Sequence, residues 1–391
     1  MARPKRPSQR SLFEEVAPAP GGAPATRKAP TKRREGARNS VRNWLIALYG
    51  LVVLMVVVGG LTRLTGSGLS ITEWRPLTGA LPPLSTEAWM AEFERYRAIP
   101  QYEIVNRGMT LAEFRVIYWW EWGHRQLGRI LGVVWAVGFL WFLLSKRMPP
   151  GWTGRLLLIG VLGGVQGAIG WWMVASGLGE GMIAVAAYRL AVHLGLAFVI
   201  LGLIGWYILR LGRTPAALVQ ARRLGDRGVF HLGTLVMALA FVQILLGALV
   251  AGLGAGKAYA DWPLMHGAFF PPEALDLEPV WRNLTENTAM VQFMHRMAGY
   301  ALVLVGAVAW VMAGASAHAA TRRAHDAMML VLAVQLVLGI ATVMTGAPWE
   351  LAVAHQLTAV LLWALVLRAR FLARYPLVRS TIRSGAREAR A

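Results

Sequence analysis

The sequence contains no cysteine among its 391 residues. This absence excludes disulfides, thiolate metal ligands, iron–sulfur clusters and the covalent attachment of a c-type heme. A metal held by this chain must therefore be bound by histidine or by oxygen. Acidic residues are also scarce, with 20 Asp and Glu against 40 Lys and Arg, which gives a formal net charge of +20. In a soluble protein such a charge would indicate nucleic-acid binding, so its distribution along the chain decides its meaning.

Long apolar segments dominate the rest of the chain, of which 56% is hydrophobic. Several segments of about 20 residues carry almost no charge, and this length crosses the hydrocarbon core of a membrane as a helix. We therefore predict an all-α integral membrane protein with eight transmembrane helices, at 44–62, 118–144, 156–175, 188–209, 229–252, 291–313, 327–345 and 350–367.

The basic residues gather before the first predicted span, after the last, and in three of the connections. The other four connections mix signs or are acidic, so the positive-inside rule places both termini and the basic loops in the cytoplasm of a bacterial inner membrane. Topology and anionic lipid explain the charge, and no nucleic-acid partner is expected. Residues 1–43 predict a disordered basic cytoplasmic tail, and residues 369–391 predict a second basic cytoplasmic tail.

The two halves of the chain resemble each other. The segment "VQGAIGWWMVASG" at 165–177 aligns without gaps on "VQLVLGIATVMTG" at 334–346. In the same way "EWRPLTGALPP" at 73–83 recurs as "DWPLMHGAFFPP" at 261–272, and "HRQLGR" at 124–129 recurs as "HRMAGY" at 295–300. Equivalent segments lie four spans apart, which predicts two pseudo-symmetric four-helix bundles in parallel orientation, at 44–210 and 228–368.

Four of the eight histidines fall one in each even-numbered span, near its outer end: His124, His193, His295 and His355. At 1.5 Å per residue they stand roughly 20 to 40 Å from the cytoplasmic flank, in the outer half of the bilayer. The repeat pairs His124 with His193 and His295 with His355. The remaining four are interpreted as surface residues: His231, His266, His318 and His325.

A single histidine in a span is equally well explained by a hydrogen bond to a backbone carbonyl across the bundle. Four histidines at repeat-related positions instead favour two bis-histidine heme sites. A zinc site is less favoured, because no carboxylate or cysteine supplies a further ligand in the second half. Arg125 and Arg296 directly follow two of the histidines, and they are predicted to pair with heme propionates, with interfacial snorkelling as the alternative.

The two halves differ three residues before the first histidine, where Glu121 precedes His124 and Gln292 precedes His295. A carboxylate beside a heme can act as a general base or stabilise a cation formed at the porphyrin edge. The alternative is charge complementarity at a helix N-terminus. Because Thr110 and Glu113 already predict a capping box further upstream, Glu121 is not needed as a cap.

The first outer connection is long, from about 63 to 117, and carries Trp89, Phe93 and Tyr96 at helical spacing. This spacing predicts an interfacial amphipathic helix that shields the site. A stripe that faces the protein core is favoured over a direct contact with substrate.

Over about residues 44 to 367 the sequence resembles the heme A synthases of bacterial and mitochondrial membranes. The resemblance rests on "GGLTRLTGSGLSITEWRPLTGALPP" at 59–83, on "EWGHRQLGR" at 121–129 and on "HRMAGY" at 295–300. It implies eight helices in two four-helix units, with a heme b cofactor in the C-terminal unit and the substrate heme O in the N-terminal unit. Some members carry a cysteine pair in the first outer loop, so this chain is similar to the cysteine-free mitochondrial and proteobacterial type.

Carried over by position, the resemblance implies that His295 and His355 ligate heme b, that His124 and His193 flank the substrate iron, and that Glu121 is the essential carboxylate. The implied reaction oxidises a methyl group of heme O to a formyl group by successive hydroxylations, which yields heme A for terminal oxidases. The implied partners are heme O, the heme O synthase and an electron acceptor, and a homo-oligomer is compatible with the sequence.

Two other functions fit parts of the pattern. A di-heme b-type membrane cytochrome that carries electrons to or from quinone would use both histidine pairs without modifying a heme. A heme or solute transporter would use the repeat but requires broken helices and polar residues near the midplane, and the spans contain few midplane charges. The synthase is therefore the main prediction, the cytochrome the alternative, and the transporter the last.

Overall fold

The computed structural model describes residues 32–179 and 181–377. Within these residues the structure is helical, and eight helices are long and apolar enough to cross a membrane. They confirm the prediction of an all-α protein with eight candidate spans: α1 (Lys32–Leu64), α4 (Leu111–Leu144), α5 (Thr153–Gly177), α6 (Ala187–Leu211), α8 (Arg227–Leu253), α10 (Thr288–Gly314), α11 (Ala319–Met344) and α12 (Trp349–Arg374).

The helices extend beyond the predicted spans. The structure continues α1 back to Lys32, so residues 32–43 are helical and the tail predicted for residues 1–43 was placed too far along the chain. At the other end α12 continues to Arg374, past the predicted boundary at 368. Hydropathy detects only the apolar part of a helix, and polar turns that emerge from the membrane escape it. Residues 1–31 and 378–391, where the remainder of the two predicted tails falls, lie outside the described residues.

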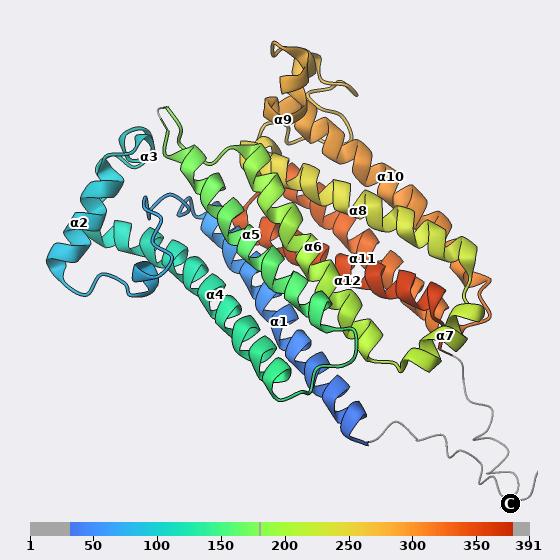
Figure 1. The fold of residues 1–391 in the computed structure, drawn as a ribbon. Coiled ribbons are helices and arrows are strands. Elements are labelled where there is room, and N and C mark those ends of the chain that lie inside the picture. The colour runs from blue at the N-terminus through green and yellow to red at the C-terminus, as the bar shows by residue number, and fades with distance from the viewer. Residues whose placement is uncertain (1–31, 180, 378–391) are drawn as a thin grey trace, which may run out of the picture.

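The eight helices form two bundles side by side (Figure 1). One bundle contains α1, α4, α5 and α6, and the other contains α8, α10, α11 and α12, with the short helix α7 (Pro215–Arg223) between them in the chain. In each bundle successive helices pack against one another and the fourth returns to the first. The second and fourth helices therefore lie on a diagonal, α4 with α6 and α10 with α12.

The bundles contact each other through α6 on α8, α6 on α12 and α1 on α12. Two polar side chains cross this boundary. Gln356 of α12 donates a hydrogen bond to the carbonyl of Val56 at 2.5 Å, and Arg63 of α1 donates to the carbonyls of Ala251 and Gly252 at 3.0 and 3.1 Å. A Cβ atom at Gly60 would lie 2.2 Å from Oε1 of Gln356, so a larger residue there would displace the Gln356 side chain.

The apolar core fills one end of the bundles. All eight long helices contribute to its largest cluster, which includes 41–56 of α1, 139–142 of α4, 198–211 of α6 and 360–372 of α12, toward the end where the described chain begins and finishes. In contrast, residues 122–129 of α4 and 293–301 of α10 include no buried residue. Those segments carry His124 and His295, so the core stops short of the histidines.

The predicted helix in the first outer connection is confirmed as α2 (Thr86–Arg97), which is followed by α3 (Pro100–Ile104). Trp89, Phe93 and Tyr96 are buried, and their rings pack on Phe114 and Tyr118 at the start of α4. The stripe therefore faces the protein core, as the favoured interpretation held. This connection also contains the 3-10 helix η1 (Thr78–Ala80).

The equivalent connection in the second half contains three 3-10 turns and one short helix, without a counterpart of α2. These elements are η2 (Ala255–Lys257), η3 (Pro272–Leu275), η4 (Val280–Arg282) and α9 (Asn283–Glu286). They lie at the same end of the molecule as α2 and α3 (Figure 1). Both long connections therefore cover the ends of the bundles nearest the four histidines.

The interpretation of His325 as a surface residue was wrong. Its side chain is fully buried in α11, where Nδ1 lies 2.9 Å from the carbonyl of Thr321 one turn earlier. This local bond satisfies one ring nitrogen, while Nε2 is buried without a hydrogen-bond partner among the described residues. His231 and His266 are exposed, as expected.

Candidate functional site

The structure brings the four membrane histidines together in two pairs. His124 on α4 and His193 on α6 occupy one diagonal, and His295 on α10 and His355 on α12 occupy the other. Each bundle thus presents two imidazoles from opposite sides, in the pairing expected from the repeat.

Each imidazole rests on a glycine of the preceding long helix. A Cβ atom on these glycines would lie 2.9 to 3.2 Å from Cε1 of the imidazole, closer than ordinary van der Waals contact. The pairs are His124 on Gly59, His193 on Gly170, His295 on Gly247 and His355 on Gly339. We call these four glycines the histidine seats.

The seats were not predicted, although a signal for two of them was present. Gly170 and Gly339 are matched in the internal repeat, but the sequence alone does not reveal that a glycine lies beneath a histidine on another helix. Gly128 and Gly299 lie one helical turn after His124 and His295, and a Cβ atom there would meet Met55 and Gln243 respectively.

A glutamine contacts the imidazole at three of the four seats. Nε2 of Gln243 lies 3.3 Å from Nε2 of His295, and Nε2 of Gln335 lies 3.2 Å from Nε2 of His355. Gln166 contacts His193 at both ring nitrogens, at 3.2 and 3.3 Å, and donates to the backbone carbonyl of His193 at 2.9 Å.

Several polar atoms at these seats are buried without a hydrogen-bond partner in the described part of the chain. They are Nδ1 of His124, His295 and His355 and Oε1 of Gln166, Gln243 and Gln335. Unpaired buried polar atoms are rare and cost about 1 to 3 kcal/mol each, so their accumulation here indicates a missing ligand. When a metal takes one imidazole nitrogen, the other nitrogen becomes a donor that needs an acceptor. The residues therefore fit a metal bound between two imidazoles.

The described residues contain no cluster of three or more histidine, cysteine, aspartate or glutamate side chains that could chelate a metal ion. A metal at either pair would receive two protein ligands and must bring its remaining donors with it. A porphyrin supplies four equatorial nitrogens to its iron, whereas a free zinc ion needs about four protein or water ligands. The donor set therefore suits heme better than zinc.

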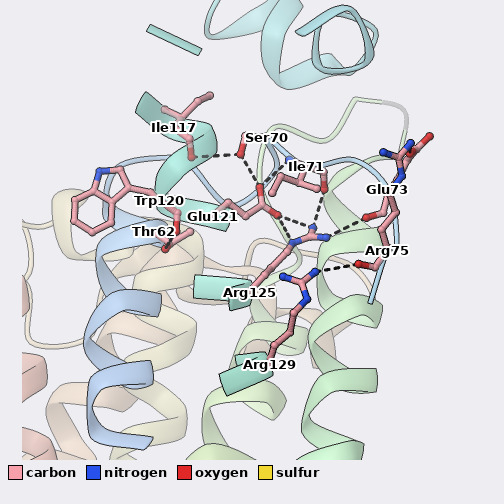
Figure 2. Close-up of polar contacts among 10 residues, drawn as sticks. All are labelled: Thr62, Ser70, Ile71, Glu73, Arg75, Ile117, Trp120, Glu121, Arg125 and Arg129. Carbon is pink, nitrogen blue, oxygen red and sulfur yellow. Dashed lines mark hydrogen bonds and ion pairs between the residues drawn. The ribbon is translucent and has the colours of Figure 1, made fainter. Parts of the chain in front are cut away.

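Glu121 is buried beside the first pair and accepts four hydrogen bonds (Figure 2). Ser70 donates its hydroxyl and Ile71 its backbone N–H, both at 2.8 Å. Arg125 donates Nε at 3.0 Å and Nη2 at 2.6 Å, which forms an ion pair one turn along the helix. Arg125 also donates to the carbonyls of Ile71 and Glu73 at 2.7 and 3.0 Å. The carboxylate and the guanidinium together fix the chain that follows α1 against α4.

In the second half an arginine again binds the carbonyls of the outer loop, but its neighbour is an amide in place of a carboxylate. Arg296 donates to the carbonyls of Tyr259, Asp261 and Leu264 at 3.2, 2.9 and 2.9 Å. Gln292, the counterpart of Glu121, donates Nε2 to the carbonyl of Tyr259 at 3.1 Å, while its Oε1 is buried without a partner. Loop attachment therefore needs the arginine in both halves, whereas the buried anion belongs to the first half alone.

A cavity of about 470 Å³ lies between the first outer connection and α4, next to Arg125. Arg75, Arg95, Arg125 and Arg129 line it together with Glu73 and Glu92, which form ion pairs with Arg75 and Arg95. Arg129 also donates to the carbonyls at 75 and 76, as Figure 2 shows for the first of them. The outer end of the first bundle therefore gathers guanidinium groups around a space that can take a carboxylate.

The helices that carry the first histidine of each pair are both capped. Thr110 and Glu113 form the predicted capping box of α4, with the Thr110 hydroxyl accepting from the backbone N–H of Glu113. In the second half Asn287 accepts from the backbone N–H of Ala289 and of Met290 at the start of α10. Since α4 has its own cap, Glu121 is not used for capping.

Comparison with known proteins gives a consistent result. The COX15-CtaA family, described as "Cytochrome oxidase assembly protein", matches residues 42–367. The chain is 60% identical over 374 residues to the heme A synthase of Dinoroseobacter shibae, covering 95% of this chain and 98% of that protein. It is 55% identical over 381 residues to the heme A synthase of Paracoccus denitrificans, covering 96% and 100%. The chain belongs to the COX15-CtaA family of cytochrome oxidase assembly proteins.

Proposed function

We propose that this protein is a heme A synthase, which oxidises a methyl group of heme O to a formyl group and so yields heme A for terminal oxidases. The observation that carries the proposal is the asymmetry between two otherwise matching histidine pairs, of which only the first has a buried carboxylate beside it. The relatives at 60% and 55% identity carry the same name.

In this proposal the second bundle holds a resident heme b between His295 and His355, and the first bundle takes heme O between His124 and His193. Heme b supplies a one-electron redox centre when bound. The unpaired ring nitrogens and the histidine seats support both assignments. Electrons removed from the substrate then have an acceptor in the neighbouring bundle.

Glu121 acts in this scheme as a fixed negative charge. Removing two electrons and a proton from the methyl group would leave a cation, which water captures to give the hydroxymethyl group with loss of a second proton, and a preorganised carboxylate in a poorly hydrated site stabilises positive charge there. Because Ser70, Ile71 and Arg125 already donate to Glu121, electrostatic stabilisation is favoured over proton abstraction. Gln292 cannot supply this charge, which restricts the chemistry to the first bundle.

Arg125 and Arg296 directly follow His124 and His295 and reach the outer loops, where they would meet the propionates of a bound heme. Arg296 donates to loop carbonyls, Arg125 divides its donors between loop carbonyls and Glu121, and the cavity beside Arg125 leaves room for one more anionic partner. We assign propionate binding to these two residues together with their role in holding the loops.

The orientation in the membrane follows from the charges. Arg210, Arg213, Arg222 and Arg223 lie in or beside α7, at the same end as the start of α1, since Arg38 donates to the carbonyl of Leu211. We assign this end to the cytoplasm and the histidine end to the outer side of the inner membrane. Heme O then arrives from the membrane, where its synthase is the expected supplier, and an electron acceptor completes the reaction.

Expression in a host that makes heme O but no heme A tests the proposal. Extracted hemes are identified by chromatography and mass. We expect heme A or its hydroxylated precursor, and we expect both to disappear in His124→Ala. Recovery of heme B alone, with heme O unchanged, would refute the synthase and favour the di-heme cytochrome that carries electrons to or from quinone.

A further inference from the structure

One of the four histidine seats lacks a glutamine. Three seats share the pattern Gln-x-x-x-Gly along their helix: Gln166 with Gly170, Gln243 with Gly247, and Gln335 with Gly339. On α1 the residue four before Gly59 is Met55. Among the described residues His124 makes no side-chain hydrogen bond, whereas the other three histidines each contact their glutamine.

Met55 occupies the place that Gln243 has in the second bundle. A Cβ atom at Gly299 would meet Nε2 of Gln243 at 3.2 Å, and a Cβ atom at the equivalent Gly128 would meet Cε of Met55 at 3.8 Å. The two side chains thus reach the same point on the neighbouring helix. Their lengths are similar, so the difference is chemical: an amide that donates and accepts in one bundle, and a thioether that is only a weak acceptor in the other.

An imidazole whose second ring N–H donates to an acceptor is fixed in orientation and is a stronger metal ligand, and loss of that hydrogen bond typically costs 10- to 100-fold in metal affinity. The amides of Gln243 and Gln335 lie against Nε2 of His295 and His355, and a 180° turn of the amide brings its unpaired Oε1 to that ring N–H and leaves Nδ1 for the metal. We propose that Met55 makes His124 the exchangeable ligand of the four, so that a heme iron in the first bundle is anchored by His193 and released from the His124 side. Met55 is a positioning residue here, because it acts on the iron only through the histidine.

This inference rests on the proposed function and deepens it. A resident cofactor needs two firm ligands, and His295 and His355 both have a glutamine partner. A substrate heme must enter and its product must leave in each cycle, so at least one histidine has to dissociate readily from the iron. His193, with three contacts to Gln166, is the firm ligand of that bundle.

Carbon monoxide binding to the reduced, heme-loaded protein measures the exchange, because carbon monoxide must displace an axial histidine nitrogen from the iron. We expect the heme of the first bundle to bind carbon monoxide at a lower concentration than the heme of the second. Met55→Gln should weaken binding in the first bundle by about 10- to 100-fold. Gln243→Met should strengthen binding in the second bundle by a similar factor.

Met55→Leu is the matched control, because it removes the sulfur without adding a hydrogen-bonding group, and it should leave the affinity unchanged. Total heme per protein verifies that each variant is folded. Equal affinities in Met55→Gln and Met55→Leu, or no effect of Gln243→Met, would overturn the inference. Extraction of the bound hemes tests the proposed function separately: heme B alone would refute the synthase, while the two substitutions would still report on their own bundles.

Discussion

In the two bundles a histidine lies at an equivalent backbone position, but the polar side chains around it differ. In the first, Glu121 and Met55 flank His124, and in the second Gln292 and Gln243 flank His295. The glycine seat and the arginine that clamps the outer loop are common to both. The two bundles therefore share the backbone positions that leave space around each histidine. They differ in the polar side chains about one helical turn from the histidine or from its glycine seat.

The largest effects are expected from removing one histidine of each pair, which tests whether the two bundles bind different hemes. His295→Ala should abolish both the resident heme b and product formation, because the electron acceptor is lost with its ligand. His124→Ala should abolish product but retain heme b. Heme extraction and absorbance spectra of the purified variants measure both quantities. Loss of heme b in both variants to the same extent would contradict separate sites.

The second-largest effect is expected from replacing the buried Glu121 carboxylate by the amide found at the equivalent position of the second bundle. Glu121→Gln makes the first bundle resemble the second and should lower turnover by about 10²- to 10³-fold, as for the loss of one preorganised electrostatic group. Product formed per unit of bound heme O gives the value. The reciprocal variant Gln292→Glu leaves the first bundle intact and should retain activity, so similar losses in the two variants would remove the assigned role of Glu121.

Alanine at a histidine seat should have a smaller effect. Gly59→Ala pushes the His124 ring aside, and Gly247→Ala does the same to His295, since the new Cβ atoms would lie 2.9 and 3.2 Å from Cε1. We expect about tenfold weaker heme binding in the affected bundle only. Gly164→Ala, which meets no atom within 4 Å, is the control. Heme titration of the purified variants resolves the difference.

The smallest effect concerns the caps that the two bundles build differently. Thr110→Ala should lower the free energy of unfolding by about 1 kcal/mol, and Asn287→Ala by a similar amount. Thermal unfolding in detergent measures both. Ser40→Ala serves as the control, because its hydroxyl bonds only to an exposed carbonyl within α1. A shift for Ser40→Ala as large as for Thr110→Ala would show that these caps add no specific stability.

Much of the fold was predictable because a membrane-spanning helix is recognised from its long, uncharged apolar segment. Eight spans, the internal repeat, the capping box of α4 and the inward stripe of α2 were all expected, and the structure contains them. Helix ends were less predictable. α1 begins at Lys32, among basic residues that hydropathy assigns to a tail, because its turns continue beyond the apolar segment.

The pairing of the four histidines was predictable from the sequence, and their surroundings were less so. Histidines at repeated positions stand out in an apolar helix, whereas the glycine beneath each one lies on another helix and carries no local signal. The ion pair of Glu121 with Arg125 was available from the sequence, since residues four apart share a helix face. The burial of His325 was not, because its partner is a backbone carbonyl that every residue possesses.

Gln356 follows the ligand His355 and inserts beside Gly60, while the adjacent Gly59 carries His124. A single Gly-Gly step on α1 therefore touches a ligand of its own bundle and the neighbour of a ligand in the other. With hemes bound as proposed, this contact would help to set the separation across which an electron must tunnel. The rate of electron transfer would then depend on the packing of one amide side chain between the two bundles.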